Sequence, residues 1–199
     1  MASNTAQATQ QPARHFNLVR CVTTCLLGLI VLVGLAVLII WLVIRPQKLV
    51  YTLVNGSIQD FNLTNNHLNA TLDFVLMAYN PNSKVSVYYD YIRSSVTYGD
   101  QTLAFNTIDP FFQPHRNTSR VESKLVALDL ALSPSAFKQL RVEKSSGEIE
   151  VDVHFKSKIR FKVGIWKSNH RTLRIVCSSV TLHFSWYKHF EVIPCEEEL

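Results

Sequence analysis

The stretch 148-EIEVDVHFKSKIRFKV-163 alternates apolar and polar side chains over a longer distance than any other part of the chain. Successive side chains of a β-strand point to opposite faces, so this period of two predicts antiparallel strands that are covered on one face and solvated on the other. The residues expected on the covered face are Ile149, Val151, Val153, Phe155, Ile159, Phe161 and Val163. The charged side chains between them would form the solvated face.

Shorter stretches on both sides of this one also predict strands, at 68–78, 85–98, 102–105, 125–132 and 172–185. Gly99-Asp100 is a turn signal between two of them and predicts a hairpin. One interruption has helical character, because Ser133 followed by Pro134 is an N-cap pattern and Gly147 a stop signal. These elements predict an all-β fold, an antiparallel β-sandwich of the immunoglobulin or fibronectin type III kind with about seven strands and one short helix.

A second decisive stretch, 21-CVTTCLLGLIVLVGLAVLIIWLVI-44, holds no charged residue between Arg20 and Arg45. A helix of this length reaches roughly 36 Å, which is enough to cross a hydrocarbon layer of about 30 Å. A buried core helix would be shorter and would show a polar stripe, and a cleaved signal peptide would have a shorter apolar run before small residues. A single transmembrane helix is therefore the expectation, with those two alternatives open.

The apolar stretch divides the chain into segments. We expect a short cytosolic tail at 1–20, the transmembrane helix at 21–44, and a membrane-proximal segment with a first strand at 45–66. The β-sandwich is expected at 67–190 and an acidic C-terminal tail at 191–199. The part that follows the helix has the size of one ordinary domain.

The orientation in the membrane is not decided by the basic residues, which are balanced on the two sides of the apolar stretch. Acceptor sequences for N-glycosylation decide it better, because all of them follow the stretch. They are Asn55, Asn62, Asn69 and Asn117. Used acceptors would place the β-sandwich in the secretory lumen and then outside the cell. Unmodified loop and strand polar residues are the alternative.

The four cysteines fit the same orientation. Cys21 and Cys25 lie at the cytosolic end of the apolar stretch, where a thiol can be palmitoylated, although such residues are often only lipid-facing. Cys177 and Cys195 would be free to pair in an oxidising compartment, but their spacing does not show that they meet. The cysteines and seven histidines show no metal-ligand spacing, so neither metal nor cofactor is expected.

No sequence motif of a known catalytic site is present, which argues against an enzyme. Glu148, Glu150 and Asp152 share one solvent-facing row, as expected for a solvated face and not for a pair of catalytic carboxylates. An exoenzyme stays open only if the fold gathers acids or a nucleophile in a cleft. The net charge of +5 is mild and most of the basic residues are scattered, so a nucleic-acid partner is not expected.

Basic side chains also form a row, at Lys156, Lys158, Arg160 and Lys162. The row could contact anionic lipid or an acidic wall polysaccharide. More often such a row is simply the wet face of a strand, in which case opposite charges are needed on the neighbouring strands.

Three segments carry a resemblance to a known family. The first is 80-NPN-82 with 85-VSVYYD-90, the second 110-PFFQPHRNT-118 and the third 159-IRFKVG-164. In the same order they resemble the NPN…YYD, PPFYQGHKNTT and VRWKVG segments of the plant harpin-induced and non-race-specific disease resistance-like family, except that Pro114 replaces the usual Gly. The motif residues taken as candidates are Asn80, Pro81, Asn82, Tyr88, Tyr89, Asp90, Phe111, Phe112 and Gln113.

The resemblance, which covers roughly residues 20–185, implies a plasma-membrane protein with a cytosolic N-terminus and an extracellular β-sandwich similar to the type-two late embryogenesis abundant domain. It implies a role in plant defence or stress without catalysis, exerted on protein partners that the sequence does not identify. Its alternative is a stress-protective module that stabilises membrane or wall contacts during dehydration. From the residues alone, Asn80-Pro81-Asn82 is turn chemistry, and Tyr88 and Tyr89 point to opposite faces, so only one of them packs inward.

Overall fold

The computed structural model describes residues 13–44, 47–184 and 189–198, in two compact units that divide after Arg45. The first unit contains helix α1 (Ala13–Ile44), whose segment Val19–Ile39 is long and apolar enough to cross a membrane. The hydroxyls of Thr23 and Thr24 donate to backbone carbonyls one turn earlier, so these two polar side chains need no water. The helix begins before the expected Cys21 and ends at the expected Ile44.

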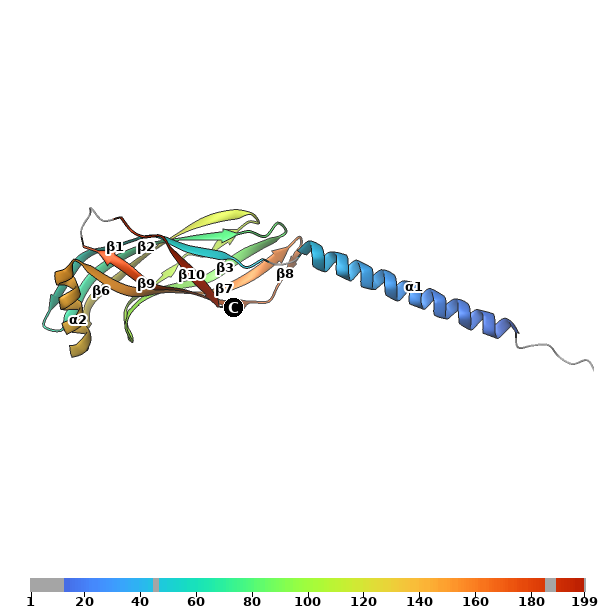
Figure 1. Cartoon of the computed structure of the whole chain (residues 1–199), viewed down its shortest axis with the longest axis horizontal. Coiled ribbons are helices and arrows are strands. Elements are labelled where there is room, and N and C mark those ends of the chain that lie inside the picture. Colours follow the sequence, from blue (N-terminus) through green and yellow to red (C-terminus); the bar gives the residue numbers. More distant parts are fainter. Residues whose placement is uncertain (1–12, 45–46, 185–188, 199) are drawn as a thin grey trace, which may run out of the picture. The chain divides into compact units, whose positions relative to one another are not determined.

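The second unit is a β-domain with one short helix (Figure 1). Its first strands are β1 (Val50–Thr64), β2 (His67–Asn80), β3 (Val85–Tyr98), β4 (Gln101–Ile108), β5 (Phe111–Gln113) and β6 (Asn117–Ala131). After helix α2 (Pro134–Ser146) come β7 (Glu148–Val163), β8 (Trp166–Lys167), β9 (Arg171–His183) and β10 (Ile193–Glu198). All the strand pairs are antiparallel, which confirms the predicted all-β sandwich class.

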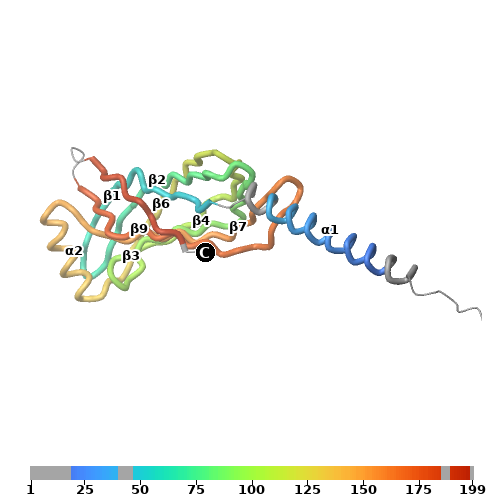
Figure 2. The backbone as a smooth tube through the Cα atoms, turned by 45° about the vertical axis from the view of Figure 1, so that its right-hand side comes forward, coloured from blue at the N-terminus to red at the C-terminus, as the bar shows by residue number. Residues whose placement is uncertain are grey.

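The strands form two layers that are continuous at one edge, in the order β4-β3-β7-β9-β10-β1-β2-β6, with β5 paired to β3 and β8 to β7. The continuity comes from β10, because Ile193–Cys195 pairs with β1 while Glu196–Glu198 pairs with β9. Figure 2 follows this C-terminal segment in red across the domain. The expected acidic tail at 191–199 thus contains a strand, so the stretch 172–185, which is the last strand that the sequence predicts, is wrong as the last strand of the domain.

The core lies between the two layers and contains the face predicted for β7. Ile149, Val151, Val153, Phe155 and Ile159 are buried, as the alternation indicated, whereas Phe161 and Val163 at the end of the strand are half-buried. The described part of the chain has ten strands instead of about seven, because β5 and β8 are too short to show a period and β10 is rich in acids.

Strand β6 changes the face that it presents to the core. Leu125 and Ala127 are buried, yet Leu128 is 78% exposed and Leu132 is buried again. The change is made at Asp129, whose positive φ of 48° and N–H donation to Asn69 Oδ1 (2.8 Å) mark a bulge. A period of two cannot show such an inserted residue in advance.

Helix α2 follows its sequence signals. Ser133 Oγ accepts a hydrogen bond from the N–H of Ala136 (3.2 Å), and Gly147 ends the helix with a φ of 90°. Ala136 and Leu140 are buried against the sandwich. The predicted short helix is confirmed at both ends.

Candidate functional site

The family-motif residues fall into a buried group and a surface group. Asn80, Asn82, Tyr89 and Gln113 are buried. Tyr88, Asp90 and Phe112 reach the opposite face of the same sheet. As expected from the strand period, only Tyr89 of the tyrosine pair packs inward.

Asn80 joins two turns at one end of the sandwich. Its Nδ2 donates to the carbonyls of Val85 (2.8 Å) and Pro114 (3.0 Å), and its Oδ1 accepts from the N–H of Asn82 (3.1 Å). Because only the carbonyl of Pro114 is used, a proline is compatible with this role at the position where the family usually has Gly.

Asn82 holds the segment through which the chain enters the β-domain. Its Nδ2 donates to Gln47 O (2.9 Å), and its Oδ1 accepts from Gln47 N (2.7 Å). Its own carbonyl accepts from the N–H of Arg116 (3.0 Å). The NPN turn therefore ties the incoming chain to two loops of the sandwich.

A second buried network surrounds Gln113. Its Nε2 donates to Ala78 O (2.6 Å), its Oε1 accepts from Tyr89 OH (3.1 Å), and Tyr89 OH is 2.8 Å from Tyr51 OH. Burial raises the pKa of both tyrosines well above the ordinary value, so they remain neutral and serve as hydrogen-bonding groups. The buried motif residues are thus architectural.

The surface group is organised by an ion pair. Arg160 contacts Asp90 with two nitrogens at 2.6 Å each, and this hydrogen bonding lowers the pKa of the Asp90 carboxyl. The guanidinium of Arg160 lies 5.5 Å and the ammonium of Lys167 4.9 Å from the ring centre of Tyr88. Tyr88 in turn lies 4.5 Å from Phe112, so rings and cations alternate here.

The basic row of β7 lies beside further cations. Lys156 is directly opposite Arg93 on β3 and Arg174 on β9, which places three positive side chains in line across three strands. Like charges in directly opposite positions destabilise a sheet. Among the ion pairs of the described residues, none involves Lys156 or Lys158. Of the balancing acids expected for a simple solvated face, Asp90 pairs with Arg160 and Glu198 on β10 is directly opposite Arg174, but the positions directly opposite Lys156 and Lys158 hold no acid.

We call this surface the cationic face. Its basic members are Arg93, Lys156, Lys158, Arg160, Lys162, Lys167 and Arg174. Its aromatic members are Tyr88, Tyr91, Phe105 and Phe112, the last three of which are exposed. Arg93 lies 5.0 Å from the ring of Phe105 and Lys162 5.8 Å from that of Phe112. Chemically, such a face can bind an extended anion and stack against flat groups.

Acidic side chains gather elsewhere, around an open pocket of about 570 Å³ between the β3–β4 turn and α2. The lining includes Asp100, Glu143, Glu150 and Asp152. Glu143 accepts from Tyr98 OH (2.7 Å) and Asp152 from the N–H of Ser179 (2.9 Å), so two of the four carboxylates are used to hold the fold. In the described ranges, no three His, Cys, Asp or Glu side chains are placed to hold a metal ion.

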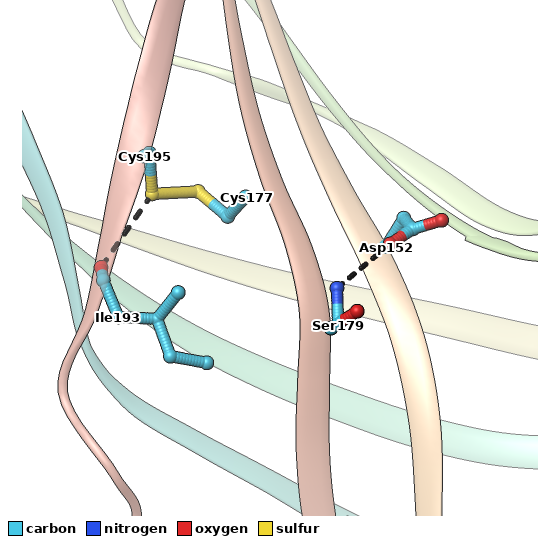
Figure 3. The surroundings of a disulfide bond; sticks show 5 residues. All are labelled: Asp152, Cys177, Ser179, Ile193 and Cys195. Carbon is cyan, nitrogen blue, oxygen red and sulfur yellow. Dashed lines mark hydrogen bonds between the residues drawn. A yellow bond between two sulfur atoms is a disulfide. The ribbon is translucent and has the colours of Figure 1, made fainter.

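The two cysteine pairs have different surroundings. Cys177 on β9 and Cys195 on β10 form a disulfide with a Cα–Cα distance of 4.4 Å (Figure 3). The disulfide links β10, which connects the two layers, to the neighbouring strand β9. Cys21 and Cys25 are free thiols, exposed on α1.

A pH effect is expected at Glu197, which the sequence did not single out because it lies in the supposed tail. Burial raises the pKa of its carboxyl above 4.5, and Lys48 offsets only part of this. Between pH 4.5 and the raised value, folded chains keep a proton that unfolded chains release, so stability falls as pH rises through this window. Glu197→Gln should remove this fall, measured as urea midpoints from pH 4 to 7.

The matched control is Glu196→Gln, at the neighbouring exposed position. It should leave the pH profile of the wild type unchanged. Identical slopes for Glu197→Gln and the wild type would contradict the assignment.

Comparison with known proteins extends these observations. The family described as late embryogenesis abundant protein matches residues 75–178. An uncharacterised protein of Arabidopsis thaliana is 38% identical over 94% of this chain and 87% of its own length. NDR1/HIN1-like protein 3 of the same plant is 37% identical over 76% of this chain and 67% of its own length. Protein NDR1 is 27% identical over 73% and 68%.

The family match covers more than half of the chain and lies within the β-domain that holds the motif networks and most of the cationic face. The NDR1/HIN1-like relatives match over most of the remaining length as well. The chain therefore belongs to the NDR1/HIN1-like family and carries its late embryogenesis abundant domain.

Proposed function

We propose that the chain is a single-pass plasma-membrane protein, with α1 in the bilayer, the N-terminus in the cytosol and the β-domain outside the cell. Helix α1 has the length and composition for this role. The orientation is supported by the glycosylation acceptors, which all follow α1, and by the disulfide, which suits an oxidising compartment.

Glycosylation provides the test of orientation. Asn55, Asn62 and Asn117 have exposed side chains, whereas Asn69 is half-buried and directly opposite Asn62 on the paired strand. Two glycans cannot easily be accommodated at facing positions about 5 Å apart, so we expect Asn62 to be used and Asn69 to be spared. In microsomes, removal of glycans should increase the mobility of the chain. The shift should persist in Asn69→Gln and vanish when Asn55, Asn62 and Asn117 are all replaced.

Within this topology, the protein acts in plant defence or stress by binding, not by catalysis. The observation that carries the proposal is the line formed by Arg93, Lys156 and Arg174. Three cations in directly opposite positions destabilise the sheet, and a single acid, Glu198 opposite Arg174, extends the line, so the row suits an anionic partner. An acidic wall polysaccharide offers carboxylates to these cations and sugar rings to the exposed aromatic side chains. The plant and defence part of the proposal comes from the names of the NDR1/HIN1-like relatives.

The binding test uses the full chain in detergent micelles and immobilised polygalacturonate. Lys156→Glu with Lys158→Glu should weaken binding at least tenfold at low salt and flatten its salt dependence. The control pair, Lys124→Glu with Lys138→Glu, makes the same change in net charge at exposed positions away from the cationic face and should retain binding. Equal loss in both pairs would indicate a net-charge effect and contradict a specific face.

The family description favours a second function, a stress-protective module that stabilises membrane or wall contacts during dehydration. The two functions separate in plants that carry the Lys156→Glu, Lys158→Glu variant. Lost partner binding together with a lost defence response supports the first. The second is supported if plants that carry this variant or Tyr88→Ala keep the binding partners of the protein but lose desiccation tolerance.

A further inference from the structure

The β7–β8 hairpin carries an apolar tip that no part of the proposed function uses. Gly164, with a φ of 58°, makes the turn; Ile165 is fully exposed and Trp166 is 61% exposed. The tip is held firmly, because Ser168 N donates to Phe161 O (2.8 Å) and Phe161 N donates to Ser168 Oγ (2.9 Å). Two large, exposed apolar side chains at the tip of a hydrogen-bonded hairpin indicate a contact surface.

Two cations lie directly below the tip. Lys162 on β7 is paired in register with Lys167 on β8, and each ammonium lies over an aromatic ring of the cationic face. Protein segments that enter the bilayer interface have this arrangement, with large apolar side chains at the tip and lysines directly behind them. The apolar groups reach the acyl boundary while the ammonium groups meet phosphates.

The position of the tip in the β-domain agrees with such a contact. Val163, just before the tip, pairs with Val85 on β3, close in sequence to Asn82. Asn82 is the residue that binds Gln47, and Gln47 is the third residue after Ile44, where α1 ends. The tip and the incoming chain therefore share one end of the domain, whereas α2 lies at the other end (Figure 1).

The charges at this end of the domain are mixed, but on balance they favour contact with an anionic membrane surface. Lys84 and Arg116 are exposed in the neighbouring turns. The acids are Asp90, which is engaged by Arg160, and Glu196–Glu198 on β10, whose last residue is paired in register with Arg174. No acid of the described residues forms an ion pair with either lysine of the hairpin.

We propose that Ile165 and Trp166 insert into the interface of the bilayer that α1 spans, and that Lys162 and Lys167 bind the phosphates of lipid headgroups. This inference rests on the proposed membrane anchor. Insertion would give the β-domain a second attachment to the membrane besides its covalent link. It would restrict the rotation of the domain and so the direction in which the cationic face is presented.

The test uses the full chain in nanodiscs of phosphatidylcholine and phosphatidylglycerol. A nitroxide is attached at Ile165→Cys in a Cys21→Ser, Cys25→Ser background, and its collisions with oxygen and with a water-soluble nickel chelate are measured. The control site is Leu128→Cys, an exposed apolar residue on β6. We expect the ratio of oxygen to nickel accessibility to be several-fold higher at 165 than at 128. Lys162→Glu with Lys167→Glu should reduce that ratio toward the control value.

A ratio at 165 equal to that at 128 would overturn the inference. Spin–spin broadening between labels at 165 would also overturn it, since it would show a contact between two copies of the chain. Extraction with carbonate distinguishes failure of this inference from failure of the membrane anchor. If the chain stays in the membrane while its tip is exposed to water, the anchor is retained and only the insertion of the tip is contradicted. The unchanged melting temperature of each labelled variant establishes that its domain is folded.

Discussion

Cys195→Ser should lower the free energy of unfolding of the β-domain by about 3 kcal/mol. This loss and the loss expected for Asn80→Ala are the largest effects that we expect from single substitutions. The bridge closes a loop between residues 18 positions apart and so restricts the unfolded chain. It also holds β10, which pairs with β1 on one side and β9 on the other. Without the bridge, the connection between the two layers depends on short ladders alone.

Thermal and urea unfolding of the full chain in detergent, followed by circular dichroism, would measure the change. Cys177→Ser should give the same loss, and the double variant no more than either single one, because the two residues act as one unit. Cys21→Ser with Cys25→Ser is the matched control, since these thiols are free. Additive losses at positions 177 and 195 would contradict a bridge.

Asn80→Ala should cost about 3 kcal/mol, although it removes only a small polar side chain. The substitution leaves the buried carbonyl of Val85, the buried N–H of Asn82 and the part-buried carbonyl of Pro114 without their partner. Each buried polar group that loses its partner costs about 1–3 kcal/mol. Loosening of Asn82 should also free Gln47, seen as faster amide exchange of the incoming segment.

The matched control is Asn169→Ala, an asparagine with an exposed side chain. It should change stability by less than about 0.5 kcal/mol. A comparable loss at both positions would show that the Asn80 network does not stabilise the fold.

Local pattern was enough for much of the fold. The alternation of β7 identified its buried face, and Ser133 with Gly147 marked both ends of α2, because strand period and helix caps depend on neighbours in the chain. Bulges were not accessible in this way. Asp129 adds one residue to β6, and only its pairing with β2 reveals it.

The candidate site was predicted in part. The row from Lys156 to Lys162 was visible in the sequence, but its neighbours Arg93 and Arg174 were not connected to it, since cross-strand register is a long-range property. The same limit hid the pairing of Lys162 with Lys167 and the division of the motif into buried and exposed members.

By itself, the sequence determined the apolar helix, the all-β class, the family motifs and the positions of the glycosylation acceptors, because each depends on composition or on spacing within one segment. Tertiary structure alone decided that β10 joins the two layers, that Cys177 meets Cys195, and that cations from three strands lie in line. These features bring together residues far apart in the chain. Their contacts are set by strand pairing and burial, which cannot be read from any single stretch of sequence.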